Sequence, residues 1–359
     1  MEQHRVAVVV DAAAVDRIRR MMMKRPVYRT LVTSVAALLM AGLSVVAAQQ
    51  QIRTPKQTPF PQKPDWSKLE VETLKVQGAV YLIAGAGGNI AAQVGDESIL
   101  LVDTGYEQMA PKVLAAIRKL SNKPLRTIIS TTMMDSHTGG AGALVKEGRQ
   151  IDNTGPGLGG RPNEADHVGH AKLLALMTDM GRDKIAVDRW PPSTYPGKQK
   201  DLSSNDEPVV ILHIPNAVTE GDSMVWFRKS DVLVTGEIMN MASFPHIDVE
   251  HGGTINGILE GLNTALEITV PKHNQEGGTM VIPGYGRIGD EHDVLEYRDM
   301  LTIIRDRVQN AIKKGMTLQQ VKAMKPSATY EYEPRFNRDP AWTAEMFVEA
   351  IYKNLSVAK

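Results

Sequence analysis

The sequence predicts an α/β protein in which two mixed β-sheets pack face to face and helices cover both outer sides, a four-layer αββα sandwich. Two observations support this prediction. Strand-like apolar runs and helix-like amphipathic segments follow one another in two successive stretches of the chain, as expected where helices cover sheets. Polar segments containing glycine also follow directly after several strand-like runs, where loops often present functional side chains.

The length and composition are those of an ordinary globular protein. The chain has 359 residues, of which 42% are hydrophobic and 23% are charged, so we expect one large or two modest domains. It contains no cysteine, which excludes disulfides, a thiol nucleophile and a thiolate metal ligand. Stability must therefore come from a large apolar core, which a chain of this length can form.

The N-terminal segment has the features of a secretory signal. Basic residues at 24–29 precede an uncharged run at 31–48, which ends with the small-residue spacing of a signal-peptidase site. We therefore expect residues 1–48 to be a signal peptide, which gives a periplasmic or secreted protein with no stable membrane insertion after cleavage. One interpretation of residues 1–20 is a mis-called start of translation. The alternative is an N-terminal membrane anchor, because 18 uncharged residues reach the lower limit for a span.

The mature chain has a mildly acidic balance. Residues 1–48 hold seven of the 41 Lys and Arg and three of the 41 Asp and Glu, which leaves 34 basic and 38 acidic residues and a net charge of −4. This balance argues against a nucleic-acid partner, whose phosphates require a basic excess. Residues 49–68 form a proline-rich linker, residues 69–290 the main domain, and residues 291–359 helices packed on the same domain.

The order of elements follows from apolar periodicity and from helix-ending signals. Strand-like runs are expected at 74–76, 80–83, 90–94, 99–102, 125–129, 208–213, 224–227 and 232–234. Helices are expected at 109–120, 143–147 and 170–180, from Asp290 to Gly315, from Thr317 to Pro326 and at 342–355, with a surface loop at 152–162.

One segment organises the chemistry of the chain, the run I-I-S-T-T-M-M-D-S-H-T-G-G from Ile128 to Gly140. It resembles the signature loop of the metallo-β-lactamase superfamily, H-x-H-x-D-H followed by x-G-G. On that pattern the four ligand positions fall on Thr132, Met134, Ser136 and His137. Because zinc prefers imidazole, thiolate or carboxylate donors, three of these four residues are unsuited to it.

Four further segments agree with the same family, in order and with ordinary spacing, between Val71 and Leu355. They are D-T-G at 103–105, P-N-A-V-T-E-G-D-S at 215–223, T-G-E at 235–237 and V-I-P-G-Y-G at 281–286. The joint agreement implies the four-layer metallo-β-lactamase fold.

The resemblance also assigns a position to each residue of these segments. It places Asp103 beneath the metal loop, Val218 and Tyr285 where the family has metal-binding histidines, and Glu237 where the family has an aspartate that bridges two metals. The family's dinuclear zinc site is therefore degenerate in this sequence. We expect the substituted positions to line the former cleft; these are Thr132, Met134, Ser136, Val218 and Tyr285.

Few metal donors remain in this sequence. We expect no cofactor, and the alternative is weak or partial zinc binding by His137 and Glu237 with help from Tyr285. Asp135 and Glu220 flank substituted positions and are candidates for metal-free acid–base chemistry with His137. The alternative for both carboxylates is an ordinary solvated position in a loop.

Two functions therefore remain open. In the first, the protein is an exported, non-catalytic or small-ligand-binding member of the superfamily that uses the former cleft. In the second, it is an active hydrolase of a small ester, amide, lactone or lactam, with a rebuilt mononuclear or metal-free site. A small molecule is the partner in either case. The sequence gives neither the substrate nor the oligomeric state.

The mature protein should begin at or near Gln49, because Val46 and Ala48 satisfy the small-residue rule of signal peptidase. N-terminal sequencing of protein purified from the native host measures this directly. Recovery of an intact segment from Leu31 to Ala48 would instead identify the run as a membrane anchor.

Overall fold

The computed structural model describes residues 64–149, 163–331 and 341–357, which all belong to one compact unit, Thr54–Lys359. The predicted signal peptide, most of the predicted linker and the predicted loop at 152–162 lie outside the described residues. None of the helices within the described ranges is long and apolar enough to span a membrane.

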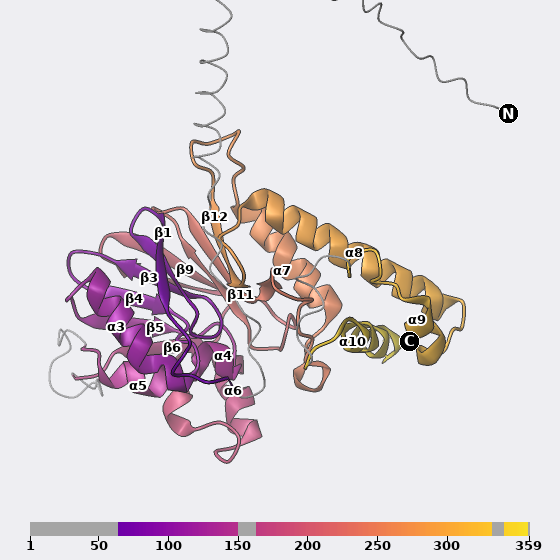
Figure 1. The fold of residues 1–359 in the computed structure, drawn as a ribbon, viewed down its shortest axis with the longest axis horizontal. Coiled ribbons are helices and arrows are strands. Elements are labelled where there is room, and N and C mark those ends of the chain that lie inside the picture. Colours follow the sequence, from indigo (N-terminus) through magenta and orange to yellow (C-terminus); the bar gives the residue numbers. More distant parts are fainter. Residues whose placement is uncertain (1–63, 150–162, 332–340, 358–359) are drawn as a thin grey trace, which may run out of the picture. The chain divides into compact units, whose positions relative to one another are not determined.

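The first sheet has seven strands whose spatial order equals their order in the chain (Figure 1). The strands β1 to β4 pair antiparallel, and β4 to β7 pair parallel. Its strands are β1 (Glu72–Gln77), β2 (Val80–Ala84), β3 (Ile90–Val94), β4 (Ile99–Val102), β5 (Leu125–Ile129), β6 (Asp166–His170) and β7 (Ser193–Tyr195).

The second sheet has five strands in the order β12-β11-β10-β9-β8. The pair β11–β12 is parallel and the other pairs are antiparallel, so both sheets are mixed, as predicted. Its strands are β8 (Gln199–Ser204), β9 (Glu207–His213), β10 (Ser223–Phe227), β11 (Val232–Asn240) and β12 (Met280–Tyr285).

The helices lie outside the two sheets. The first group is α3 (Ala110–Leu120), α4 (Asp135–Thr138), α5 (Ala141–Lys146) and α6 (Ala171–Met180); the second group is α7 (Ile255–Ile268), α8 (Glu291–Lys313), α9 (Leu318–Met324) and α10 (Ala344–Val357). Short 3-10 helices at Glu107–Met109, Val187–Arg189 and Val249–His251 complete the described elements.

Three apolar cores define four layers. The central core joins the inner faces of both sheets, a second core joins the outer face of the first sheet to α3 and α5, and a third joins the outer face of the second sheet to α7, α8 and α10. Because successive side chains of a strand point to opposite faces of the sheet, one strand contributes to two cores. In β4, Leu100 and Val102 enter the central core, while Ile99 and Leu101 face α3. The predicted αββα sandwich is confirmed.

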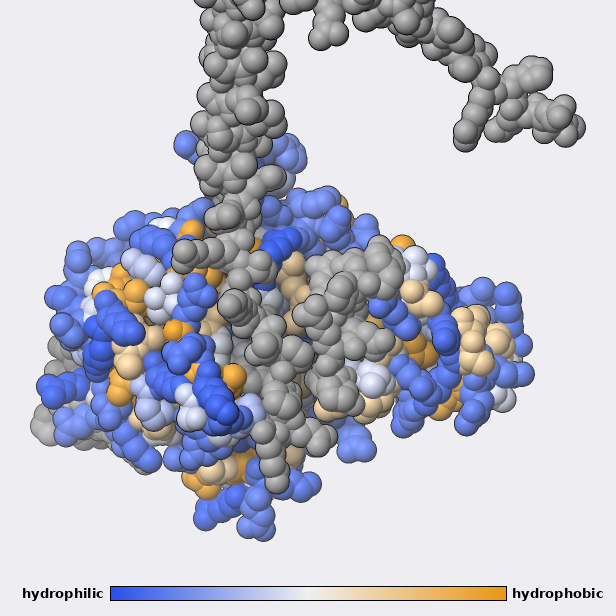
Figure 2. Space-filling model, viewed as in Figure 1, coloured by the Kyte–Doolittle hydropathy of each residue, from blue (hydrophilic) through white to orange (hydrophobic). Residues whose placement is uncertain are grey.

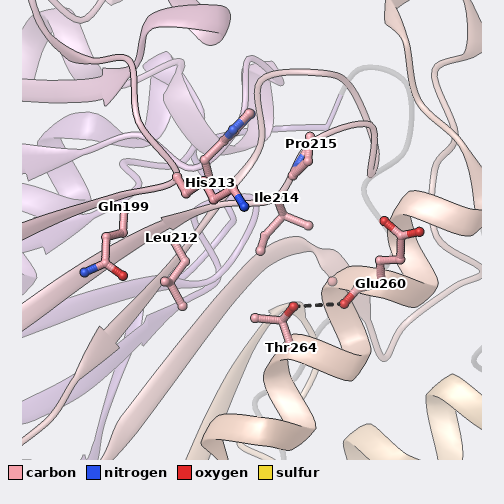
Figure 3. A pocket seen from close by; sticks show the side chains of 9 residues that line it. Gln199, Leu212, His213, Ile214, Pro215, Glu260 and Thr264 are labelled. Atoms are coloured by element: carbon pink, nitrogen blue, oxygen red, sulfur yellow. Dashed lines mark hydrogen bonds between the residues drawn. The ribbon is translucent and has the colours of Figure 1, made fainter.

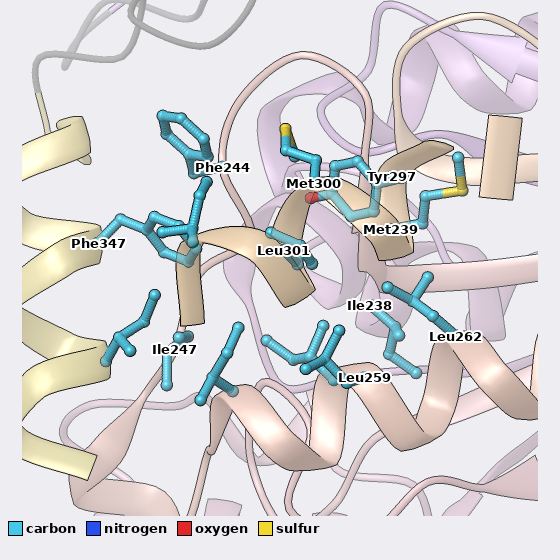
Figure 4. Close-up of a cluster of buried hydrophobic side chains, with 14 of the residues drawn as sticks. Ile238, Met239, Phe244, Ile247, Leu259, Leu262, Tyr297, Met300, Leu301 and Phe347 are labelled. Carbon is cyan, nitrogen blue, oxygen red and sulfur yellow. The ribbon is translucent and has the colours of Figure 1, made fainter. Parts of the chain in front are cut away.

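Helices α8 and α10 contribute to the third core. Helix α8 begins with a capping box between Asp290 and Asp293, and its buried side packs on α7. In the third core the rings of Phe244 and Phe347 stack with centroids 4.8 Å apart (Figure 4). Among the coloured residues in Figure 2, most are hydrophilic, and the apolar residues form small separate patches.

The structure also contains elements that the sequence analysis did not predict, chiefly α7, β6, β7 and β8. Helix α7 carries Gly257 and Gly261, which weaken the helical pattern. Both glycines permit close packing, since a Cβ on Gly257 would lie 1.8 Å from the Asn216 carbonyl oxygen and one on Gly261 would lie 2.7 Å from the Ile214 side chain. Strand β8 is an edge strand of mainly polar residues, which gives little apolar signal.

The end of the predicted linker is docked on the domain. The Trp66 ring packs on Tyr106 with centroids 5.1 Å apart, and Lys112 donates hydrogen bonds to the carbonyl oxygens of Trp66, Ser67 and Leu69. The chain is therefore held on α3 before β1 begins.

Replacing Phe347 with alanine should lower the free energy of unfolding by about 3–5 kcal/mol, because the ring is fully buried against Phe244. Met346→Ala is the matched control. Its side chain is on the same helix and 42% exposed, so we expect a change within about 0.5 kcal/mol. Urea unfolding of the three proteins gives the comparison, and equal stability of the two variants would show that α10 is not part of the domain core.

Candidate functional site

The candidate site is built on the ends of β4 and β5. Asp103 follows β4 with a φ of +63°, an uncommon backbone conformation that turns its carboxylate back under the next loop. One carboxylate oxygen accepts the Thr131 backbone N–H at 2.9 Å, and the other accepts the Thr131 hydroxyl at 2.7 Å. This buried carboxylate therefore fixes the start of the signature-like loop.

His137 lies fully buried in that loop, between two carboxylates. Its Nδ1 lies 2.8 Å from an Asp103 oxygen, and its Nε2 lies 2.9 Å from a Glu237 oxygen. A carboxylate can only accept, so both ring nitrogens must donate, and the ring is an imidazolium. Burial lowers the pKa of His137, but the charges and hydrogen bonds of Asp103 and Glu237 outweigh burial and raise it to about 10.

Glu237 reaches the histidine from β11 in the second sheet. Its other carboxylate oxygen accepts a hydrogen bond of 3.0 Å from the Asn240 side-chain amide, and Asn240 also accepts the backbone N–H groups of Ala242 and Ser243. The triad of Asp103, His137 and Glu237 consequently connects the end of β4 in the first sheet with β11 in the second.

A glycine-rich loop between β2 and β3 covers the His137 ring. A Cβ on Gly88 would lie 2.5 Å from Cε1 of the imidazole, so no larger residue fits there without moving the ring. The neighbouring Asn89 side chain donates to the carbonyl oxygens of Pro283 and Gly286. The sequence analysis gave this loop no part in the site, although its G-A-G-G-N composition was a signal of close backbone approach.

A third carboxyl group lies near the triad. Asp222 is buried and accepts hydrogen bonds from the backbone N–H and hydroxyl of Thr219. Burial raises the pKa of Asp222 to about 7, with the charge of Glu237 adding to the effect and the nearby Thr132 hydroxyl opposing it. Within the described residues neither Oδ1 of Asp222 nor the Thr132 hydroxyl has a hydrogen bond of ordinary geometry.

The substituted ligand positions differ in exposure. Thr132, Ser136 and Val218 are buried, whereas Met134 and Tyr285 are half-buried. The Tyr285 ring contacts His137 edge to face, with centroids 5.7 Å apart. The structure thus brings Tyr285 beside the triad, while the lining of the former cleft by all five positions stays a prediction.

Asp135 and Glu220 do not pair with His137. The Asp135 side chain is 72% exposed and pairs with Arg189 at 2.5 Å, and Glu220 pairs with Lys172 at 3.0 Å. Each carboxylate pairs with a basic side chain that is distant in the sequence, so the spacing of residues could not predict the pair. Glu220 belongs to an ion pair near the surface and Asp135 is the exposed partner of the buried Arg189, so neither has the contact with His137 that the acid–base role considered in the sequence analysis requires.

Comparison with known proteins identifies the fold. The DIM-1 metallo-β-lactamase superposes with a TM-score of 0.50 over 65% of this chain and 97% of its own, at 17% identity. The sec-alkylsulfatase Pisa1 of Pseudomonas sp. superposes with a TM-score of 0.56 over 79% of this chain and 50% of its own, at 14% identity.

The chain has the metallo-β-lactamase fold.

A curated relative agrees with this fold and with hydrolase ancestry. The linear primary-alkylsulfatase of Pseudomonas sp. (strain ATCC 19151) is 23% identical over 294 residues, which cover 72% of this chain and 53% of the enzyme. This metallo-β-lactamase-fold chain thus spans about half the length of the alkylsulfatases that it resembles. No family model matches it.

The residues present do not fit the zinc ions of this fold. Among the described residues no group of three or more His, Cys, Asp or Glu side chains is arranged to hold a metal. Both nitrogens of His137 are committed to carboxylates, and a metal ligand needs a nitrogen lone pair. Thr132, Met134 and Val218 add a hydroxyl, a thioether and a hydrocarbon, which are poor or absent donors.

The His137 ring should be an imidazolium at pH 8, with both N–H protons present. Nitrogen–proton correlation spectra of the histidine rings, with His137→Gln used for assignment, measure the protonation state. Resonances of a neutral ring at that pH would contradict the assigned pairing.

The same pairing should make stability depend on pH. Because the pKa of His137 in the folded state is raised from 6.5 to about 10, its stabilising effect is complete below pH 6.5 and is lost as the pH rises towards 10. His137→Gln should cost about 3–5 kcal/mol at neutral pH and flatten the pH dependence above pH 7. The exposed pair His292–Glu296 supplies a control, since His292→Gln should change stability by less than about 1 kcal/mol.

Proposed function

We propose that this chain is an exported protein of hydrolase ancestry that binds no catalytic zinc, does not hydrolyse the substrates of its fold relatives, and serves in small-molecule binding. The observation that carries the proposal is the position of His137, with each ring nitrogen hydrogen-bonded to a buried carboxylate. In this proposal the His137 imidazolium takes the place of the metal ion that the resembled family binds.

Proton competition strengthens this argument. To become a ligand, His137 must lose a proton whose pKa is about 10, which at pH 7 costs about 4 kcal/mol. Catalytic zinc also requires about three strong protein donors and an open position for water. Glu237 is the remaining carboxylate at the former bridging position, so the donor set supplies neither the affinity nor the metal-bound hydroxide on which hydrolysis in this fold depends.

The alternative function is hydrolysis without metal. Asp222 favours it, because a buried carboxyl group with a pKa of about 7 is suited to general acid–base catalysis near neutral pH. The substrate classes for this alternative are a small ester, amide, lactone or lactam. The alkylsulfatase resemblance adds an alkyl sulfate ester to that set.

Purified mature protein should contain far less than one equivalent of zinc and show no chelator-sensitive hydrolysis. Elemental analysis after gentle purification measures the first quantity. A screen of carboxylic esters, lactones, β-lactams and alkyl sulfates, with and without chelator, measures the second. A zinc-dependent metallo-β-lactamase purified in parallel controls for metal lost during handling. Stoichiometric zinc and activity that both disappear in His137→Ala would overturn the proposal.

Chelator-resistant hydrolysis would identify the metal-free alternative, provided that it depends on Asp222. Asp222→Asn keeps the shape of the side chain and removes its titration, so it should abolish such activity. Asp135→Asn is the matched control, because that carboxylate is exposed and paired with Arg189. Equal activity in both variants would exclude Asp222 as the acid–base group.

A further inference from the structure

A cavity of about 330 Å³ lies between β9 and α7, on the helix side of the second sheet. Figure 3 shows Leu212, His213 and Ile214 on the strand and Glu260 and Thr264 on the helix that faces it. Its volume is at the lower end of the range for small-molecule sites. None of its lining residues belongs to the triad of Asp103, His137 and Glu237, so inferences about this cavity do not depend on the proposed function.

The floor of the cavity is apolar. Leu212, Ile214 and Pro215 line it, together with Gly261 of α7. A Cβ on Gly261 would lie 2.7 Å from the Ile214 side chain, so the glycine sets how closely the helix approaches the strand. An apolar floor of this size accommodates a short aliphatic group.

The rim carries one side chain of each charge. Lys198 and Glu260 both line the cavity and are exposed. Among the described residues neither side chain forms a salt bridge, whereas nearby Lys172 and Glu220 pair with each other. A cation and an anion therefore remain available beside one apolar floor.

The His213 side chain lies on the other face of β9 and takes no part in the rim. Leu212 and Ile214 pack in the core on the α7 side, whereas the His213 ring stacks on that of His170 in the first sheet, with centroids 3.5 Å apart. Its Nε2 donates to the Glu220 carbonyl oxygen at 2.9 Å. Lys198 and Glu260 are therefore the two charged groups of the rim.

We propose that this cavity binds a small zwitterion with a short aliphatic side chain, of the size and chemistry of a free apolar amino acid. Lys198 receives its carboxylate, Glu260 receives its ammonium group, and the apolar floor receives the side chain. A simple anion would leave Glu260 without a partner and a simple amine would leave Lys198 without one, so a ligand with both charges matches the rim best.

Three probes of matched shape test the charge requirement on the mature protein. They are L-leucine, 4-methylpentanoate, which lacks the ammonium group, and 3-methylbutylamine, which lacks the carboxylate. Titrations followed by the methyl resonances of Leu212 and Ile214 should show binding of L-leucine, with each single-charge probe about fivefold weaker. Thr264→Phe should abolish binding of all three probes by filling the cavity.

Charge variants then assign each contact. Glu260→Gln should remove the preference for L-leucine over 4-methylpentanoate, and Lys198→Gln should remove the preference over 3-methylbutylamine. Both side chains are exposed, so we expect both variants to fold as the wild type does. Unchanged methyl spectra of the ligand-free variants will verify their folding. The proposal is overturned if L-leucine leaves the methyl resonances unchanged, if a single-charge probe binds as well, or if either variant keeps the wild-type preference.

Discussion

The centre of this fold depends on a buried charge that must be paired. His137 has no exposure to solvent and contacts Asp103 on one ring nitrogen and Glu237 on the other. Removing an ion from water costs several kcal/mol unless neighbouring groups of opposite charge compensate it. Two carboxylates require a cation between them, and the imidazolium supplies one from within the chain.

This pairing also joins segments that approach from both sheets. Asp103 lies at the end of β4, His137 in α4 and Glu237 in β11. The aspartate also binds the Thr131 backbone and hydroxyl, so one carboxylate organises both the loop and the charge.

Much of the fold was predictable because its signals are local. The alternation in β4, the capping box at Asp290 and the D-T-G and I-P-G segments each fix an element from neighbouring residues. Helix α7 was not predictable from its pattern, because Gly257 and Gly261 weaken the helical signal. The glycines are required by the close approach of Asn216 and Ile214, which are tertiary contacts that the local sequence does not show.

In the candidate site, too, sequence position identifies residues, whereas packing determines their partners. Sequence position identified His137 and Glu237, but not that a carboxylate would occupy each ring nitrogen. The sequence analysis made Asp135 and Glu220 candidate partners of His137, yet Arg189 and Lys172 bind them. Charge partners on separate elements are set by packing, which a single sequence records only through inherited motifs.

The ionisable groups around His137 differ in burial and pairing from those around the cavity between β9 and α7. Around His137 the charges are buried, and the imidazolium is fully committed to two carboxylates, so exchange with a ligand would require breaking strong charge-assisted bonds. Around the cavity between β9 and α7, Lys198 and Glu260 are exposed and form no salt bridge within the described part of the chain. Binding a ligand has a lower free-energy cost where the charged groups are unpaired, so the proposed small-molecule binding is better suited to that cavity than to the surroundings of His137.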